Sequence, residues 1–269
     1  MEQRLFFDIG ILPVGKVCDL RCKGCFWSSK HPAQFMKASD PLFTHLSQIG
    51  IKRCFIGGGE PFLHPKIDEI LSNLAKKVFI RYLLTHGGNL SEHKDLINGK
   101  VDTLIVSLDK MHKEAMREKD YPMRILSSIS KLSSPTVVRI NTVIKDRGNL
   151  PFLFSLRDKI ASIKQIKNWH IYPMIPRTMS MEEYCKIIDS VNASSPLNFK
   201  VEYKIPQSNF LQLLIFPDYS IESLSFDDNW SLKQKMVRDI FTFNTLDNLL
   251  QHAKSLHKID GSSYEQMGE

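Results

Sequence analysis

Short apolar segments alternate with helix-like segments along most of the chain. Six of these apolar segments are predicted to be buried strands, at residues 5–12, 51–56, 78–84, 101–108, 136–144 and 167–174. Helices are predicted between them at 39–50, 65–77, 91–98 and 150–163, with a longer one ending near residue 132. Strands joined by helical crossovers form a parallel sheet with right-handed connections. We therefore predict an α/β fold, an open (β/α)6 partial TIM barrel with a C-terminal extension.

The pattern is less regular in the C-terminal third. A capping box at Ser180 predicts a helix to about residue 191. Strands are predicted at 199–205 and 211–216 with a hairpin return at 221–224, helices at 233–241 and 246–257, and a disordered tail after 260. We expect residues 1–224 to form the core partial barrel with its closing strands. Residues 225–269 are expected to form a helical extension and a flexible tail.

Composition and charge limit the environment and the partners. A chain of 31.0 kDa with 42% hydrophobic residues can bury one sizeable core. The net charge of +7 favours anionic partners such as nucleotides or phosphorylated metabolites. Nucleic acid is not indicated, because no basic run is interleaved with aromatic residues. No apolar stretch reaches membrane-spanning length and no signal peptide is recognised, so we expect a cytoplasmic protein without a membrane partner.

Three cysteines lie within eight residues, at Cys18, Cys22 and Cys25. Clustered thiolates bind zinc or iron-sulfur clusters in preference to hard cations. A cubane 4Fe-4S cluster normally takes four cysteines. Three cysteines would therefore leave one iron without a protein ligand, open to bind and reduce another molecule. The spacing indicates a metal centre with a catalytic role.

Other interpretations of the cysteines remain open. A structural zinc site with His31 as the fourth ligand has a tolerable spacing, although it would not require the Gly-Gly-Gly-Glu-Pro turn at 57–61. A disulfide framework fits less well, because five cysteines is an odd number. Cys54 and Cys185 lie far apart in the sequence and are expected to be packed thiols. We therefore expect no second cluster.

The C-x3-C-x2-C spacing of Cys18, Cys22 and Cys25, followed by Gly57-Gly-Gly-Glu-Pro61, resembles the radical S-adenosylmethionine (radical SAM) superfamily. The resemblance implies the same partial barrel, with one 4Fe-4S cluster on these cysteines and S-adenosylmethionine as cofactors. It also implies that one electron from the cluster splits S-adenosylmethionine into methionine and a 5'-deoxyadenosyl radical. That radical then abstracts hydrogen from a bound substrate.

The resemblance also implies contacts to the cofactor. Gly57, Gly58, Gly59 and Glu60 match the segment that holds the methionine amino group. Gly24 stands where the family usually has an aromatic residue next to the adenine, so the chain departs from the family pattern there.

Further candidate residues lie at the ends of predicted strands, the edge at which parallel α/β sheets collect their ligands. They are Ser107, Asp109, Asn141, Tyr172 and Met174. By resemblance, the first three would hold the ribose or carboxylate of the cofactor, and Tyr172 and Met174 would meet the adenine. Helix capping and core packing are the structural alternatives. His86, in the turn after the third predicted strand, could contact substrate or simply be exposed.

The leading interpretation is a radical SAM enzyme acting on a bound anionic small molecule or nucleotide. One alternative is radical modification of a peptide or protein, as in peptide maturases and glycyl-radical activases. A second alternative is a non-catalytic cluster or zinc protein. The resemblance further implies an electron donor such as flavodoxin or ferredoxin.

Overall fold

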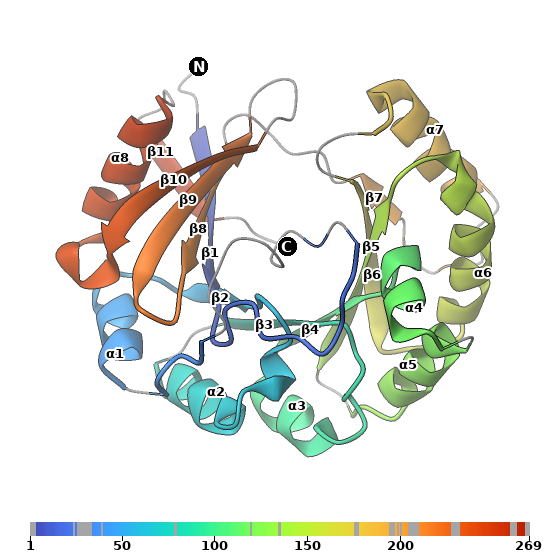
Figure 1. The fold of residues 1–269 in the computed structure, drawn as a ribbon, viewed down its shortest axis with the longest axis horizontal. Helices are drawn as coiled ribbons and strands as arrows, with labels where there is room; N and C mark the ends of the chain where they lie inside the picture. The colour runs from blue at the N-terminus through green and yellow to red at the C-terminus, as the bar shows by residue number, and fades with distance from the viewer. Residues whose placement is uncertain are drawn as a thin grey trace. The chain divides into compact units, whose positions relative to one another are not determined.

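The chain forms two compact units. The computed structural model describes residues 4–23, 25, 34–38, 40–77, 80–118, 120–133, 136–174, 178–193, 197, 199, 201–203, 210–226, 232–258 and 263–266. The first unit comprises 1–18, 27–83 and 206–269, and the second comprises 19–26 and 84–205. Figure 1 follows the chain from the blue N-terminal strand to the red C-terminal helix.

The sheet of the first unit is built around β1 (Arg4–Ile11), which has parallel neighbours on both sides. These neighbours are β2 (Arg53–Ile56), followed by the start of β3 (Ile80–Thr85), on one side, and β8 (Phe210–Ile215) on the other. Two antiparallel strands, β9 (Ser220–Phe226) and β10 (Leu232–Asp239), continue from β8. A short strand, β11 (Ser263–Gln266), pairs in parallel with the start of β1.

Helices of the first unit pack through apolar stripes. They are α1 (Asp40–Gln48), α2 (Ile67–Lys76) and α8 (Leu246–His257), with short 3-10 helices η1 (Pro61–Leu63) and η3 (Ile240–Thr242). In α2, Ile67, Ile70, Leu71 and Leu74 are buried at helical spacing, which gives the helix one core-facing side. None of the described helices is long and apolar enough to span a bilayer.

The second unit contains four parallel strands with helices between them. The strands are β4 (Thr103–Ser107), β5 (Val137–Ile144), β6 (Ile166–Pro173) and β7 (Val201–Tyr203). The helices are α3 (Lys94–Lys100), α4 (Lys110–Met116), α5 (Tyr121–Ser130), η2 (Arg147–Asn149), α6 (Leu150–Ile160) and α7 (Met181–Ala193). Ser180 accepts a hydrogen bond from the Glu183 N–H at 3.1 Å, which confirms the predicted helix start.

Strand β5 explains how this sheet presents polar groups. Its residues alternate strictly between buried and partly accessible. Ile140 and Thr142 are on the buried face, where Trp169 of β6 donates a hydrogen bond to the Thr142 hydroxyl at 2.9 Å. Arg139 and Asn141 share the other face. Strand β5 therefore has one side that packs in the core and one side that carries polar groups.

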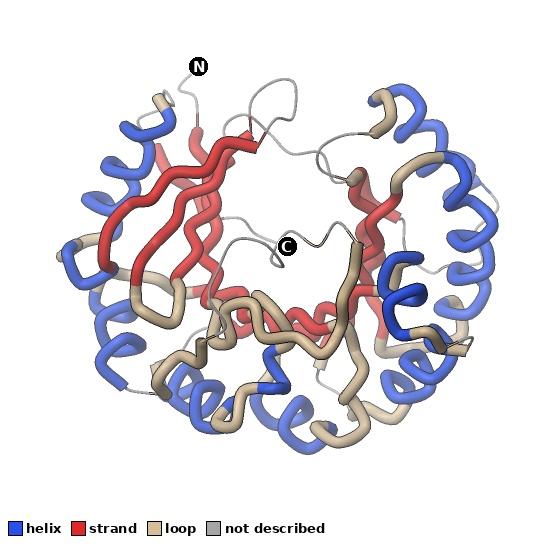
Figure 2. The backbone as a smooth tube through the Cα atoms, in the orientation of Figure 1, coloured by secondary structure: helices blue, strands red, loops and turns tan. Residues whose placement is uncertain are grey.

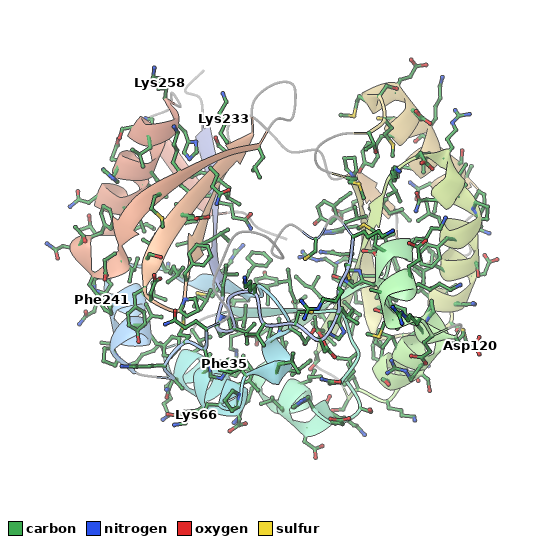
Figure 3. All side chains as sticks on the ribbon, in the orientation of Figure 1. Phe35, Lys66, Asp120, Lys233, Phe241 and Lys258 are labelled. Carbon is green, nitrogen blue, oxygen red and sulfur yellow. The ribbon has the colours of Figure 1, made fainter. Side chains whose placement is uncertain are left out.

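The C-terminal predictions need two corrections. Residues 233–241 form strand β10 and the short η3 instead of a helix, as Figure 2 shows in red and blue. Lys233 and Lys235 are exposed and Gln234 less so, a strand alternation that pairing with β9 enforces over the helical preference of these residues. Figure 3 labels Lys233 on this strand. The tail predicted to be disordered contains β11, because β1 offers it backbone partners.

Other predicted elements are close to those found. The long helix predicted to end near residue 132 is two helices, because Arg117 takes a left-handed conformation (φ 53°) that ends α4. Helix α8 has the predicted bounds. Strand β9 runs across residue 224, and the proposed division there into two domains stays a prediction.

Candidate cofactor and cluster site

The glycine-rich segment lies against the residues that lead into the cysteines. Gly58 has a φ of +104°, which side-chain-bearing residues rarely adopt. A Cβ on Gly59 would lie 2.0 Å from the Val17 carbonyl oxygen. The Gly59 N–H donates to the Gly15 carbonyl and the Glu60 N–H to the Val17 carbonyl, both at 2.8 Å. Glycine is needed here because two backbones touch, one residue before Cys18.

The same hydrogen bonds define what the segment can offer a ligand. The Gly57 N–H also donates within the chain, to the Ile11 carbonyl at 3.0 Å. Three of the four N–H groups of residues 57–60 therefore donate internally. The remaining backbone capacity of the segment is mainly that of carbonyl oxygens, which accept hydrogen bonds. An ammonium group supplies only donors. The segment therefore fits a protonated amino group.

Glu60 is fully buried, with its carboxylate turned into the fold. Its Oε1 accepts a hydrogen bond from the Phe62 N–H at 3.2 Å and caps η1. The side chain thus fixes the turn that follows the glycines.

The three clustered cysteines are of intermediate exposure. The Cys25 N–H donates to the Cys22 carbonyl at 3.3 Å, which closes a turn between these two residues in the second unit. Cys54 differs, because its thiol is completely buried and burial raises its pKa, as expected for a packed and inert thiol. His31 and Gly24 lie outside the described residues.

His86 is buried and holds part of the cysteine loop. Its side chain is 3% exposed, and Nε2 lies 2.8 Å from Oδ1 of Asp19, the residue after Cys18. Its other ring nitrogen, Nδ1, accepts a hydrogen bond from the Gly88 N–H at 3.0 Å. Of the two alternatives given for His86, simple exposure is therefore wrong.

A row of polar residues crosses the sheet of the second unit. Ser107 on β4 lies opposite Asn141 on β5, Asn141 opposite His170 on β6, and His170 opposite Glu202 on β7. His170 Nε2 is 3.3 Å from the Glu202 carboxylate, and His170 Nδ1 is 3.4 Å from the Tyr172 hydroxyl. Residues opposite each other in a parallel ladder share a face, so these side chains line one surface.

In this row, the side-chain oxygen of Asn141 is the group that most clearly fits a ligand. Its Oδ1 is buried and has no hydrogen-bond partner among the residues that the structure describes. A buried acceptor without a partner costs about 1–3 kcal/mol, and folded proteins rarely leave one unsatisfied without a functional reason. Asn141 therefore fits a ligand that donates a hydrogen bond.

Asp109 and Met174 are placed differently. Asp109 is 1% exposed and caps α4, because its Oδ1 accepts from the His112 backbone N–H at 2.9 Å. The same oxygen is 2.7 Å from the His112 Nδ1. Helix capping, the structural alternative for Asp109, is therefore present. The Met174 N–H donates to the Ile144 carbonyl at 2.8 Å, which extends the pairing of β5 and β6 by one residue.

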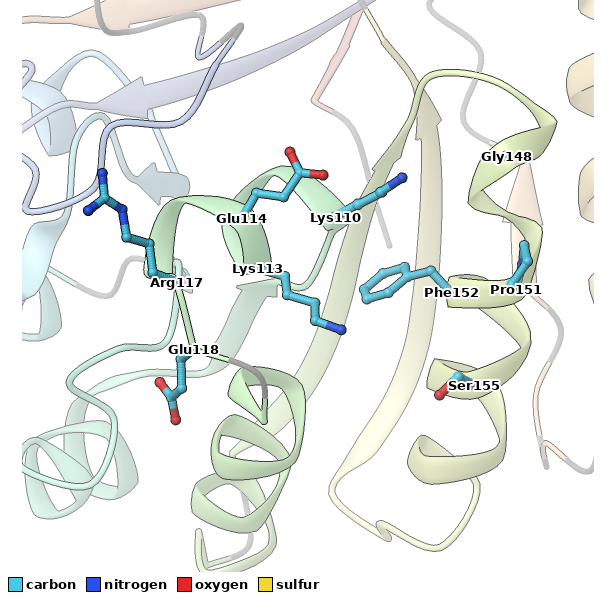
Figure 4. A pocket seen from close by; sticks show the side chains of 9 residues that line it. All are labelled: Lys110, Lys113, Glu114, Arg117, Glu118, Gly148, Pro151, Phe152 and Ser155. Carbon is cyan, nitrogen blue, oxygen red and sulfur yellow. The ribbon is translucent and has the colours of Figure 1, made fainter.

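A groove of about 670 Å³ lies on the helical side of the second unit, between α4 and α6. Figure 4 shows the Lys113 side chain and the Phe152 ring pointing toward each other across it. Glu118, at one end, is paired with Arg124 at 2.9 Å. The groove lining does not include the predicted cofactor residues, so we do not assign it to the cofactor.

Residues 12–144 match the family model of the Radical SAM superfamily, and the chain belongs to this family of enzymes. It is 35% identical over 107 residues to the antilisterial bacteriocin subtilosin biosynthesis protein AlbA of Bacillus subtilis. This alignment covers 36% of this chain and 23% of AlbA. It is 27% identical over 167 residues to a probable GTP 3',8-cyclase of Methanopyrus kandleri, which covers 58% of this chain and 54% of that protein. The chain thus spans less than two thirds of either relative.

Solved structures confirm the fold class. Streptococcus suis SuiB bound to S-adenosylmethionine matches with a TM-score of 0.62 and 16% identity, over 81% of this chain and 59% of SuiB. Native anSMEcpe with bound AdoMet and the Kp18Cys peptide matches with a TM-score of 0.65 and 15% identity, over 91% of this chain and 80% of that one. The predicted open partial TIM barrel is confirmed. Members of this family carry a 4Fe-4S cluster and bind S-adenosylmethionine, the predicted cofactors.

Sequence reasoning missed two interactions. The Asp19–His86 pair joins residues 67 positions apart, which sequence spacing does not reveal. The His170–Glu202 pair needs the register of β6 and β7, which side-chain pattern alone does not give.

Proposed function

We propose that this chain cleaves S-adenosylmethionine at a 4Fe-4S cluster held by Cys18, Cys22 and Cys25. A cluster bound there would supply the one electron that splits a carbon–sulfur bond of S-adenosylmethionine, giving methionine and a 5'-deoxyadenosyl radical that would abstract hydrogen from substrate. The observation that carries this proposal is the backbone contact of Gly59 and Glu60 with Gly15 and Val17, directly before the first cysteine. The contact connects the glycine-rich segment to the cysteine loop.

Different residues of the chain would bind different parts of the cofactor. The carbonyl oxygens of Gly57, Gly58 and Gly59 accept from the methionine amino group, and buried Glu60 holds their turn in place. Asn141 and Ser107, opposite each other on β5 and β4, hold the ribose or carboxylate.

Three further residues complete the proposed cofactor site. Asp109 has less support because one of its oxygens already caps α4. Tyr172 and Met174 meet the adenine at the end of β6, where the Tyr172 hydroxyl also contacts His170.

An anaerobic reconstitution tests this proposal. The protein is loaded with iron and sulfide, reduced with dithionite and mixed with S-adenosylmethionine. The nucleoside products are then separated and identified by mass spectrometry. We expect dithionite-dependent 5'-deoxyadenosine, and its loss in Glu60→Ala. A well-loaded protein that yields none would favour the alternative of a non-catalytic cluster protein. A protein that binds only tetrahedral zinc would favour the zinc alternative.

For the substrate, we infer an anionic small molecule or nucleotide. The net charge of +7 favours such a partner. Relatives named GTP 3',8-cyclase support it, and one from Mycobacterium tuberculosis aligns over 91% of this chain at 21% identity. Turnover in deuterated candidates tests the proposal, because transfer of the label to 5'-deoxyadenosine identifies both the substrate and the position of abstraction.

A peptide is the second candidate substrate. The similarity to the subtilosin biosynthesis protein AlbA, at 35% identity, is the observation that favours it. A precursor-peptide or glycyl-radical-enzyme gene beside this one would support it. The same label-transfer assay, run with a deuterated peptide, separates the two candidates. The electron donor, such as flavodoxin or ferredoxin, is part of either proposal.

A further inference from the structure

We propose that His86 is a positioning residue that fixes the cysteine loop through Asp19. The proposal rests on the proposed function, since it takes Cys18, Cys22 and Cys25 as cluster ligands. Asp19 and His86 lie 67 positions apart in the sequence, yet their side chains approach to 2.8 Å. Asp19 directly follows Cys18 and precedes Cys22 by three residues. A hydrogen bond at Asp19 therefore restrains the loop between two ligands.

The hydrogen bonds around the ring define which nitrogen acts on the loop. Nδ1 of His86 accepts from the Gly88 N–H, so this nitrogen carries no proton. The ring proton is therefore on Nε2, which donates to the Asp19 carboxylate. A hydrogen bond to a charged acceptor is about twice as strong as one between neutral groups. The Gly88 N–H, in the turn after β3, thus determines that Nε2 is the ring nitrogen that donates a hydrogen bond to Asp19.

The position of His86 is fixed by groups packed around it. The Tyr121 hydroxyl of α5 donates to the His86 carbonyl at 2.5 Å and reaches the Ser107 carbonyl at 3.1 Å. Gly88 passes so close to the ring that a Cβ there would lie 2.6 Å from His86 Cε1. The imidazole is therefore anchored from its backbone and its ring, and it can hold a partly exposed carboxylate such as Asp19 in one place.

Outer groups that orient the ligands of a metal centre commonly change metal affinity by about 10- to 100-fold when they are removed. In this chain His86 acts on the loop through the side chain of Asp19. Loss of the Asp19–His86 bond should therefore leave the cluster able to form but faster to lose iron. Iron release from the reconstituted protein into a chelator measures this effect.

Asp19→Ala is the main test variant, because Asp19 is 45% exposed and its replacement does not disturb the core. We expect iron release about tenfold faster than in the unaltered protein. Glu92→Ala is the matched control, since it removes one exposed carboxylate after the same turn. In His86→Gln, iron release should stay as slow as in the unaltered protein, because the Gln amide N–H can take the place of the Nε2 N–H. His86→Asn should not, because its shorter amide corresponds in position to Nδ1.

Amide hydrogen exchange of residues 19–23 in the metal-free protein gives a second readout that does not need the cluster. We expect faster exchange there in Asp19→Ala and His86→Asn, because loss of the bond lets the loop open more often, and no change in His86→Gln. Unchanged iron release and unchanged exchange in Asp19→Ala would overturn the proposal, as would a His86→Gln variant that behaves like His86→Asn. Cofactor cleavage by the unaltered protein tests the proposed function separately.

Discussion

Replacing Gly59 by alanine tests the contact on which the proposed site depends. The new Cβ would lie 2.0 Å from the Val17 oxygen, whereas real Cβ atoms essentially never come closer than 3.0 Å, so the two backbones must separate by about 1 Å. That movement breaks the bonds of Gly59 to Gly15 and of Glu60 to Val17, both 2.8 Å long. Two such hydrogen bonds contribute about 1–3 kcal/mol to folding.

For a chain of this size, a loss of ~2 kcal/mol lowers Tm by about 4–8 °C. Thermal unfolding of the metal-free protein, followed by circular dichroism, measures this change. The segment that moves leads into Cys18, so we also expect a lower iron content after anaerobic reconstitution.

Gly99→Ala is the control for this prediction. Gly99 lies in α3, and a Cβ there would meet nothing within 4 Å. Alanine should stabilise this helix by about 0.5–1 kcal/mol. A Gly59→Ala protein with unchanged Tm and iron content would refute the close-contact argument. A Gly99→Ala protein destabilised to the same extent would refute it as well.

Two further predictions follow from single side chains. Asn141→Leu should leave the free energy of unfolding unchanged or higher, because it removes a buried acceptor without a partner among the described residues, yet weaken S-adenosylmethionine binding about tenfold. Urea denaturation measures the free energy of unfolding and equilibrium dialysis measures S-adenosylmethionine binding. Unaltered binding would contradict the assignment of Asn141 to the cofactor site. Burial lowers the pKa of both His64 and His257 below the usual value of 6.5. The unfolded chain then takes up these protons at a higher pH than the folded one, so stability should fall as pH drops through about 6.5. His257→Asn should reduce that fall in urea titrations at pH 7.5 and 5.5, and an identical fall would contradict it.

The sequence predicts the core of this fold because local pattern and tertiary structure agree there. Strand β5 alternates the polar Arg139 and Asn141 with the apolar Val138 and Ile140, and the apolar residues of this alternation are the buried ones. Helix α2 likewise carries its buried residues at helical spacing. In both elements the side chains meet the core through their own periodicity, so sequence reasoning needs no knowledge of the partner.

The C-terminal strands could not be predicted in the same way. In β10, residues such as Lys233, Lys235 and Met236 favour a helix by themselves, and pairing with β9 decides the outcome. Strand β11 is defined by its parallel pairing with the start of β1, which the pattern of residues 263–266 does not indicate.

Part of the candidate site could likewise be predicted from the sequence and part could not. The cysteine and glycine motifs are contiguous in sequence, so spacing reveals them. The Asp19–His86 bond and the row from Ser107 to Glu202 depend on strand register and on a turn brought back to the loop, which spacing does not show. The capping of α4 by Asp109 could be inferred only as an alternative, because capping and ligand binding use the same carboxylate.

The central claim is that three cysteines hold a cluster whose remaining iron binds the cofactor. Electron–nuclear double resonance on the reduced, reconstituted protein tests it most directly, with S-adenosylmethionine carrying nitrogen-15 in its amino group. We predict a nitrogen-15 hyperfine coupling to the cluster that disappears in Cys22→Ala. A cluster signal that shows no coupling to the labelled amino group would contradict the account.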